Sequence, residues 1–357
     1  MSIARLARPE IQVLEPYQAA RQVTDSIRLN ANEAPWTSNL NQFRKPLNRY
    51  PEIRPQALRK TLADHYRCRP EQLLVTRGSS EAIDLLLRVF CRAGVDNIVT
   101  TAPTFSMYRH YADVQGAETR EVATRRDDNF AVDVDALLAA CDQSTRLIFI
   151  CSPNNPTGNL VSRGALVDLL ERRGSESAVV IDEAYIEFAA EASAVELLDT
   201  YDNLIVLRTL SKALGYAGAR CGSVMAAPAV IDMLDAVLAP YALATPVVEC
   251  VENALQSDRL SEAEQRIAEV VLERERMIAA IREFPVVRRV WPSAGNFFLV
   301  EVDGVDALLQ QTSSDNILLR YFGGSLADCV RISVGTRDEN DLLLRSFAAL
   351  CGDPDGR

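Results

Sequence analysis

The chain has 357 residues, enough for two domains that each bury a core. Its formal net charge of −11 disfavours nucleic acid as a partner, because a phosphate backbone would be repelled. With only two histidines, a histidine-based zinc site or a serine–histidine triad is not expected, and no metal is predicted. The eight scattered cysteines form no C-x-x-C pair and predict reduced thiols in a cytoplasmic protein, and no apolar run is long enough for a membrane span.

The first regular elements are predicted beyond a proline-containing N-terminal arm. A helix is predicted over residues 57–66 and a strand over 73–76, from the spacing of their apolar residues. Gly78, Ser79 and Ser80 then stand at the start of a second helix. Free N–H groups and hydroxyls at a helix start form an anion site, although an ordinary helix cap has the same composition.

Strands and helices alternate through the middle of the chain. Together with 73–76, the predicted strands are residues 97–101, 118–123, 147–150, 178–181, 204–207 and 222–226, and the predicted helices between them include 134–141 and 163–173. This alternation predicts a mostly parallel, seven-stranded sheet with helices on its faces. In such sheets, ligands bind at the carboxyl ends of the strands.

Three motifs follow three of these predicted strands. Asn155 lies in the first motif, Asp182 and Tyr185 in the second, and Lys212 in the third. The third motif also carries Ser211, and Arg220 follows it, which supplies a hydroxyl and a planar fork for a phosphate. An amine, an acid, ring-oxygen donors and a phosphate cup are the groups needed to hold pyridoxal phosphate, which we therefore predict as the cofactor.

In the C-terminal third, the sequence predicts a long amphipathic helix over residues 262–284, followed by a smaller α+β unit. Its predicted strands are residues 286–290, 296–302, 317–320 and 329–334, and its last helix is 337–351. Arg331, on the last strand, is costly to bury unless an anion meets it, either a substrate or the carboxylate of a structural ion pair. Arg320, at the end of another predicted strand, is a second candidate fork.

Together the three motifs resemble those of the fold-type I aminotransferases. Further stretches narrow the resemblance to the histidinol-phosphate aminotransferase family: residues 29–33, 48–52, 76–81, 103–108 and 330–337. The resemblance runs from about Pro16 to Thr336. It implies an arm over 1–47 that contributes to the small domain and to a dimer contact, a large cofactor-binding domain over 48–255 and a small C-terminal domain over 256–357.

The resemblance also implies a role for each matching residue. Lys212 would bond to the cofactor and move the substrate proton, Asp182 would pair with the pyridinium nitrogen, and Tyr185 would bond the ring oxygen. The remaining cofactor ligands would be Asn155 on the ring oxygen, Phe105 stacked on the ring, and Ser79, Ser80, Ser211, Arg220 and Tyr50 of the partner subunit on the phosphate. The residues around the substrate would be Tyr17, Asn32, Asn296, Arg320 and Arg331.

The implied reaction is amino transfer between glutamate and imidazole acetol phosphate, with 2-oxoglutarate and histidinol phosphate as the other pair, in histidine biosynthesis by a homodimer. Phe105 and Ala219 depart from the family pattern, where tyrosine and leucine are usual. An aromatic amino-acid aminotransferase of the same fold is the first alternative, and a non-enzymatic protein that kept the fold is the second. A nicotinamide dehydrogenase is disfavoured, because no G-x-G-x-x-G follows the first strand.

Overall fold

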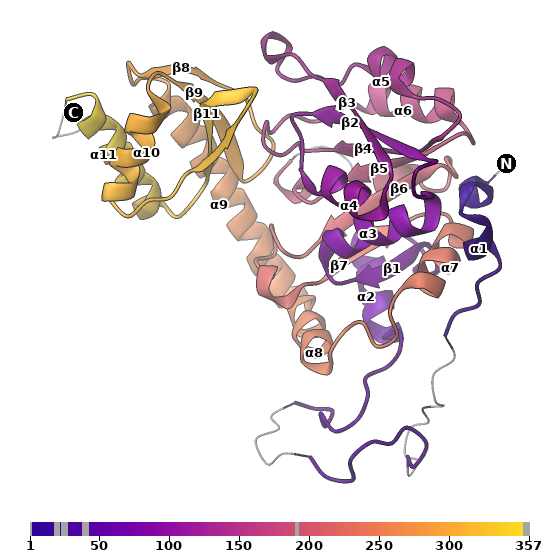
Figure 1. The fold of residues 1–357 in the computed structure, drawn as a ribbon. Helices are drawn as coiled ribbons and strands as arrows, with labels where there is room; N and C mark the ends of the chain where they lie inside the picture. The colour runs from indigo at the N-terminus through magenta and orange to yellow at the C-terminus, as the bar shows by residue number, and fades with distance from the viewer. Residues whose placement is uncertain (1, 18–21, 23–27, 38–42, 190–192, 353–357) are drawn as a thin grey trace.

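Two β-sheets, joined by the long helix α9 (Ser257–Ile281), form the framework of the molecule (Figure 1). The structure is a computed structural model that describes residues 2–17, 22, 28–37, 43–189 and 193–352. The larger sheet and its helices precede α9, and the smaller sheet follows it. The described residues between α1 and α2 (13–17, 22, 28–37 and 43–55) form no helix or strand, and those nearer α2 lie away from the larger sheet (Figure 1).

The larger sheet has seven strands in the order β1-β7-β6-β5-β4-β2-β3. They are β1 (Leu73–Thr76), β2 (Asn97–Ala102), β3 (Glu118–Ala123), β4 (Thr145–Cys151), β5 (Ala178–Asp182), β6 (Leu204–Thr209) and β7 (Gly222–Met225). Strands β2 to β6 pair in parallel, whereas β7 runs antiparallel to both β1 and β6. The prediction of a mostly parallel, seven-stranded sheet is confirmed.

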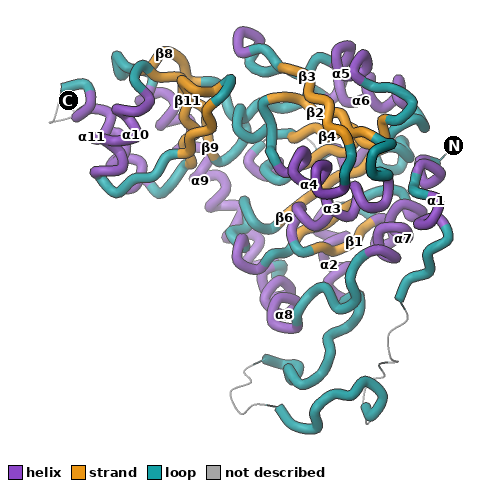
Figure 2. The backbone as a smooth tube through the Cα atoms, viewed as in Figure 1, coloured by secondary structure: helices purple, strands orange, loops and turns teal. Residues whose placement is uncertain are grey.

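Helices cover both faces of this sheet (Figure 2). Successive side chains of a strand point to opposite faces, so in β4 Phe149 belongs to the core on the α3 side and Ile148 to the core on the α6 side. Both are fully buried. The helices of this part are α1 (Pro9–Gln12), α2 (Gln56–Tyr66), α3 (Gly78–Phe90), α4 (Met107–Gln115), α5 (Val134–Ala140), α6 (Arg163–Arg173), α7 (Pro228–Val237) and α8 (Thr245–Ala254).

Helix α4 lies between two predicted strands, where the apolar pattern gives no helical signal. Only Tyr108 and Ala112 of its nine residues are buried, so its apolar face is too narrow to produce the helical spacing. The helix packs on α3 and leads into β3. It brings Tyr108 beneath the carboxyl ends of the central strands, where the side chain contacts β4 and β5.

The smaller sheet is antiparallel throughout, in the order β10-β11-β9-β8. Its strands are β8 (Val287–Val290), β9 (Phe297–Val302), β10 (Arg320–Gly323) and β11 (Leu326–Ser333), and its helices are α10 (Val305–Ser314) and α11 (Arg337–Leu350). The prediction of a strand over 317–320 was wrong, because the Ile317 amide donates to the Thr312 carbonyl at 2.8 Å and closes α10. The strand therefore begins at Arg320 and continues beyond it.

Two apolar clusters join the smaller sheet to the larger part. In one of them Phe130 packs against Trp291 with ring centroids 5.2 Å apart. In the other, Tyr185 meets Phe297 edge to face at 5.0 Å. Because Tyr185 follows β5 and Phe297 begins β9, this second contact brings the smaller sheet to the carboxyl ends of the parallel strands.

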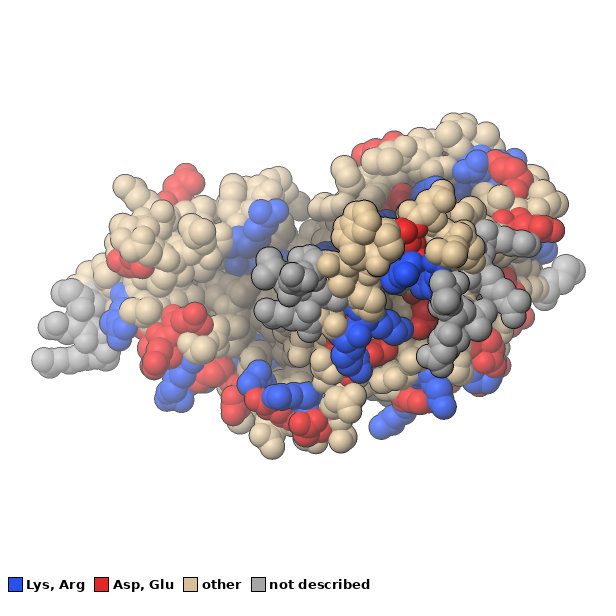
Figure 3. Space-filling model, turned by 90° about the horizontal axis from the view of Figure 1, so that it is seen from below, with Lys and Arg blue, Asp and Glu red and all other residues tan. Residues whose placement is uncertain are grey.

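The charged groups on the arm side of the molecule are mixed in sign. Figure 3 shows basic and acidic side chains interspersed across that face. A nucleic-acid site needs a continuous basic surface, and this face has none among the described residues. In the described part of the chain, no helix combines the length and the apolar character needed to cross a bilayer.

Candidate active site

A cavity of about 720 Å³ opens at the carboxyl ends of β4, β5 and β6, and residues of β10 and β11 line its other side. It brings together residues that lie up to about 250 positions apart in the chain. Eleven of the residues singled out from the sequence line it: Ser79, Ser80, Phe105, Asn155, Asp182, Tyr185, Ser211, Lys212, Arg220, Arg320 and Arg331.

The amine and the acid of the predicted cofactor site face each other across two adjacent strands. Asp182 is the last residue of β5 and is 1% exposed, and Lys212 follows β6 by three residues. Burial raises the pKa of Asp182 to about 6, and the Tyr108 hydroxyl, the Ala184 amide and the Lys212 charge counteract part of that rise. Burial lowers the pKa of Lys212, and the nearby Arg331 and Arg220 lower it further. An amine with a lowered pKa is a better base and nucleophile near neutral pH.

The Asp182 carboxylate has one hydrogen-bond donor on each oxygen. The Tyr108 hydroxyl donates to Oδ2 at 2.9 Å, and the Ala184 amide donates to Oδ1 at 3.2 Å. Tyr108 is fully buried and stacks on Phe149 with ring centroids 4.8 Å apart. Sequence reasoning assigned Tyr108 no role, although the residue lies in one of the stretches that carried the family resemblance.

An anion cup lies beside Lys212, where β7 passes under the first turn of α3. A Cβ atom on Gly222 would lie 2.7 Å from the Ser79 amide nitrogen, so only glycine lets β7 approach this helix start. Arg220 has φ 53°, a left-handed backbone that is uncommon for a residue other than glycine, and its Nη1 lies 3.4 Å from the Ser211 hydroxyl. Helix N–H groups, hydroxyls and a guanidinium together favour a phosphate.

Two arginines line the side of the cavity formed by the smaller sheet. Arg320 and Arg331 are paired residues of β10 and β11, and the Phe322 ring lies 5.3 and 5.6 Å from their guanidinium carbons. Arg331 contacts Asn155 through Nη1, while its buried Nε has no partner. Burial and the charge of Arg320 lower the pKa of Arg331. Among the described residues, no carboxylate lies within ion-pair distance of either arginine, so no acidic side chain there neutralises either charge.

Four of the predicted residues stand outside the lining of this cavity. Tyr50 is 50% exposed and stacks on Tyr241 at 4.8 Å, while Tyr17 is 61% exposed. Asn32 is exposed in a left-handed backbone conformation. Asn296 is half-buried just before β9. The described part of the chain also contains no group of three or more His, Cys, Asp or Glu residues placed to hold a metal ion.

The fold and this set of residues define a class of proteins. Residues 15–347 match the family model of the class I and II aminotransferases. The chain therefore belongs to that family, whose cofactor is pyridoxal phosphate. The cavity fits the cofactor, because it offers an amine, a buried carboxylate and a phosphate cup within one enclosure.

Relatives of known name narrow the comparison further. The chain is 39% identical over 353 residues to the histidinol-phosphate aminotransferase of Shigella sonnei (strain Ss046), which covers 98% of both chains. The histidinol-phosphate aminotransferase of Sinorhizobium meliloti, solved with pyridoxal-5′-phosphate, superposes with a TM-score of 0.78 at 25% identity over 86% of this chain and 83% of that chain. An aromatic aminotransferase from Pyrococcus horikoshii OT3 reaches 0.74 at 20% identity over 85% and 87%. The fold alone therefore does not distinguish between these substrates.

Proposed function

We propose that this chain reversibly transfers an amino group between glutamate and imidazole acetol phosphate, with 2-oxoglutarate and histidinol phosphate as the other pair, in histidine biosynthesis. The observation that carries the proposal is the pair of arginines, Arg320 and Arg331, that face the cavity without an acidic partner among the described residues. The relative from Shigella sonnei, similar over almost its entire length, supports the same substrate.

Several residues of the cavity have specific roles toward the cofactor. Bound pyridoxal phosphate supplies an aldehyde that accepts amines and a ring that accepts electrons. Lys212 would anchor the aldehyde carbon through Nζ and would move a proton between the substrate carbon and that carbon of the cofactor. Asp182 would pair with the protonated ring nitrogen, while Tyr185 and Asn155 would hydrogen-bond the ring oxygen. Phe105 would cover one face of the ring.

The phosphate groups are held at two separate ends of the cavity. Ser79, Ser80, Ser211 and Arg220 bind the phosphate of the cofactor. Arg320 and Arg331 bind the phosphate of the substrate, where two planar forks match an anion with up to two charges. Because the chain carries a net charge of −11, a local pair of cations is needed to draw such a substrate in. Tyr17, Asn32 and Asn296 complete the substrate site in the assembled enzyme.

The proposal is tested by supplying the purified holoenzyme with histidinol phosphate and 2-oxoglutarate and measuring glutamate. We expect glutamate to form in proportion to the histidinol phosphate consumed. If no glutamate forms with this donor although it forms with phenylalanine, the proposed substrate is wrong and the aromatic aminotransferase alternative replaces it.

We further propose that the enzyme is a cytoplasmic homodimer with shared active sites, organised as an arm (1–47), a large domain (48–255) and a small domain (256–357). All eight cysteines lie in the described residues and none is bonded to another, which supports a reducing compartment. Tyr50 supports the shared site, because it lies outside the cavity of its own chain. Part of the arm (18–21, 23–27 and 38–42) lies outside the described residues.

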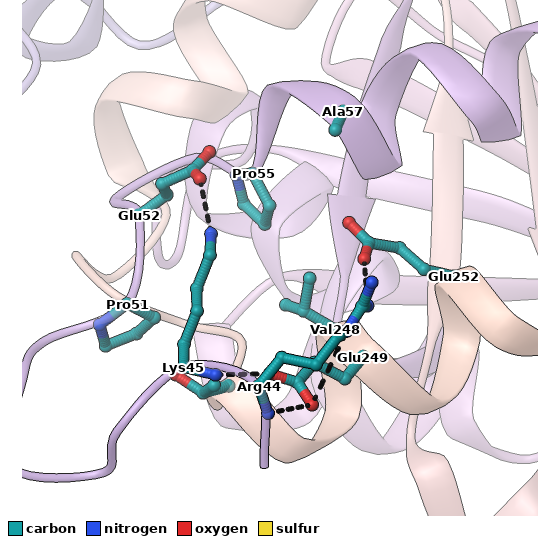
Figure 4. A pocket seen from close by; sticks show the side chains of 10 residues that line it. Arg44, Lys45, Pro51, Glu52, Pro55, Ala57, Val248, Glu249 and Glu252 are labelled. Carbon is teal, nitrogen blue, oxygen red and sulfur yellow. Dashed lines mark hydrogen bonds and ion pairs between the residues drawn. The ribbon is translucent and has the colours of Figure 1, made fainter. Parts of the chain in front are cut away.

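The segment that leads to Tyr50 is fixed on its own chain. The backbone amides of Arg44 and Lys45 donate to the two carboxylate oxygens of Glu249 in α8, at 3.0 and 2.9 Å. Lys45 Nζ reaches Glu52 at 2.8 Å beyond the turn, beside a small pocket of about 160 Å³ (Figure 4). The turn is therefore held at both sides, while the ring of Tyr50 stays half exposed. Such exposure is needed if Tyr50 contacts the cofactor of the partner subunit.

The shared site predicts complementation between two inactive variants. Mixing Tyr50→Ala chains with Lys212→Ala chains should restore amino transfer, because one site of each hybrid dimer receives both intact residues. The measurement is activity after subunit exchange, with exchange verified by differently tagged chains. Each variant mixed with itself is the control. Absence of recovery in verified hybrids would show that both residues act within one chain.

A further inference from the structure

A buried tyrosine, Tyr108, lies beside the proposed cofactor site and contacts its carboxylate. Tyr108 is fully buried in α4, and its hydroxyl makes a 2.9 Å hydrogen bond to Asp182 Oδ2. Burying a phenol is costly unless its hydroxyl finds a partner, and here that partner is Asp182, the carboxylate proposed to pair with the ring nitrogen of the cofactor. The hydroxyl thus points at the cofactor site from below.

The ring of Tyr108 is fixed from two sides. It stacks on Phe149 of β4 at 4.8 Å with an interplanar angle of 15°, and it meets Phe105 edge to face at 5.7 Å. Phe105 itself lines the cavity. Because the stack leaves the phenol little freedom to turn, the hydroxyl is held at one point relative to the end of β5.

We propose that Tyr108 is a positioning residue for amino transfer, whose hydroxyl fixes the Asp182 carboxylate in the orientation that the pyridinium nitrogen of the cofactor requires. The Ala184 amide occupies the other carboxylate oxygen, so together the two donors prevent rotation of the group. The inference rests on the proposed role of Asp182 and not on the identity of the substrate. It adds an electrostatic function, since a donated hydrogen bond favours the charged form of a carboxylate.

The direction of the pH effect follows from the groups that surround Asp182. Burial raises its pKa, while the Tyr108 hydroxyl, the Ala184 amide and the Lys212 charge lower it, in that order. Cys151 and Tyr185 also lie close to it and are neutral, because burial raises the pKa of both. Removing the Tyr108 hydroxyl therefore raises the pKa of Asp182. Asp182 therefore becomes protonated at a higher pH, and the acid limb of the pH–rate profile moves to higher pH with it.

The test compares Tyr108→Phe with the wild-type holoenzyme in the half-reaction with glutamate, between pH 5 and pH 9. We expect the acid limb to move up by about one pH unit and the dissociation constant of pyridoxal phosphate to rise about tenfold, which is the loss of one charge-assisted hydrogen bond. Tyr111→Phe is the matched control, because it also removes a tyrosine hydroxyl, here from a half-buried residue of the same helix. It should leave the acid limb and the dissociation constant unchanged.

A double-mutant cycle separates positioning from a purely structural role. In an Asp182→Asn background there is no carboxylate to hold, so adding Tyr108→Phe should have almost no further effect on the affinity for pyridoxal phosphate. An equal loss of affinity in both backgrounds would overturn the proposal, and so would an unchanged acid limb in Tyr108→Phe. Because cofactor affinity is measured by titration of the apoprotein, the result does not depend on which amino donor the enzyme prefers.

Discussion

Replacing Lys212 with alanine is expected to lower amino transfer by at least about 10⁴-fold, since a positioned acid–base group alone contributes 10²–10⁴ and this residue also anchors the cofactor. The amine lies three residues beyond β6 and in the same cavity as Asp182. The measurement is the rate of the half-reaction with glutamate, followed by the absorbance of the bound cofactor. Lys60→Ala, on an exposed position of α2, is the matched control and should retain full activity.

The same variant tests how the cofactor is held. The anion cup and Asp182 do not depend on the Lys212 amine, so Lys212→Ala should still bind pyridoxal phosphate, but borohydride should no longer fix it to the chain. The other lysines of the chain are Lys45 and Lys60. Borohydride-resistant attachment in the variant would assign the anchoring amine to one of these two and contradict the proposed site.

Replacing Arg331 with lysine is expected to lower kcat/KM for histidinol phosphate on the order of ten- to a hundredfold, because the charge remains while the bidentate geometry is lost, at a cost of about 1.5–3 kcal/mol. Arg331 Nε is buried without a partner, so the side chain depends on a ligand for its full set of hydrogen bonds. Steady-state kinetics with each substrate is the measurement. Arg345→Lys, at an exposed position of α11, makes the same exchange away from the cavity and should leave kcat/KM unchanged.

Replacing Arg320 in the same way distinguishes the two substrates. Glutamate presents one negative charge to the arginines, whereas the phosphate of histidinol phosphate presents up to two, so the second fork matters more for the phosphate. We therefore expect Arg320→Lys to raise KM for histidinol phosphate more than KM for glutamate. Equal losses for the two substrates would contradict the phosphate-binding role of the pair.

The centre of the site could be predicted from sequence because the topology of a parallel sheet brings strand ends together. Asn155, Asp182 and Lys212 each follow a short apolar run, and the structure places all three at or just beyond the ends of adjacent strands around one cavity. These residues could be identified without knowledge of long-range packing, since each lies in a motif that directly follows its predicted strand. Arg331 was found for a related reason, because a cation within a buried strand needs an anion.

Other features depend on packing that the sequence pattern does not record. Helix α4 buries too few residues to give a periodic signal, and Tyr108 reads from sequence as an ordinary core residue although its hydroxyl bonds to Asp182. The strand that carries Arg320 was placed too early, because Ile317 and its neighbours are apolar yet end a helix. Leu318 is 89% exposed there, so apolar character at that position does not indicate burial.

The most direct test of the proposed function is a comparison of two amino donors in the first half-reaction. Holoenzyme is mixed with histidinol phosphate or with phenylalanine, and the absorbance of the cofactor is followed in a single turnover. The two-arginine site predicts that the second-order rate constant for histidinol phosphate is at least about tenfold higher than that for phenylalanine. One additional charge-assisted contact is worth about 1.5–3 kcal/mol. A higher value for phenylalanine would contradict the phosphate-binding account and identify an aromatic aminotransferase instead.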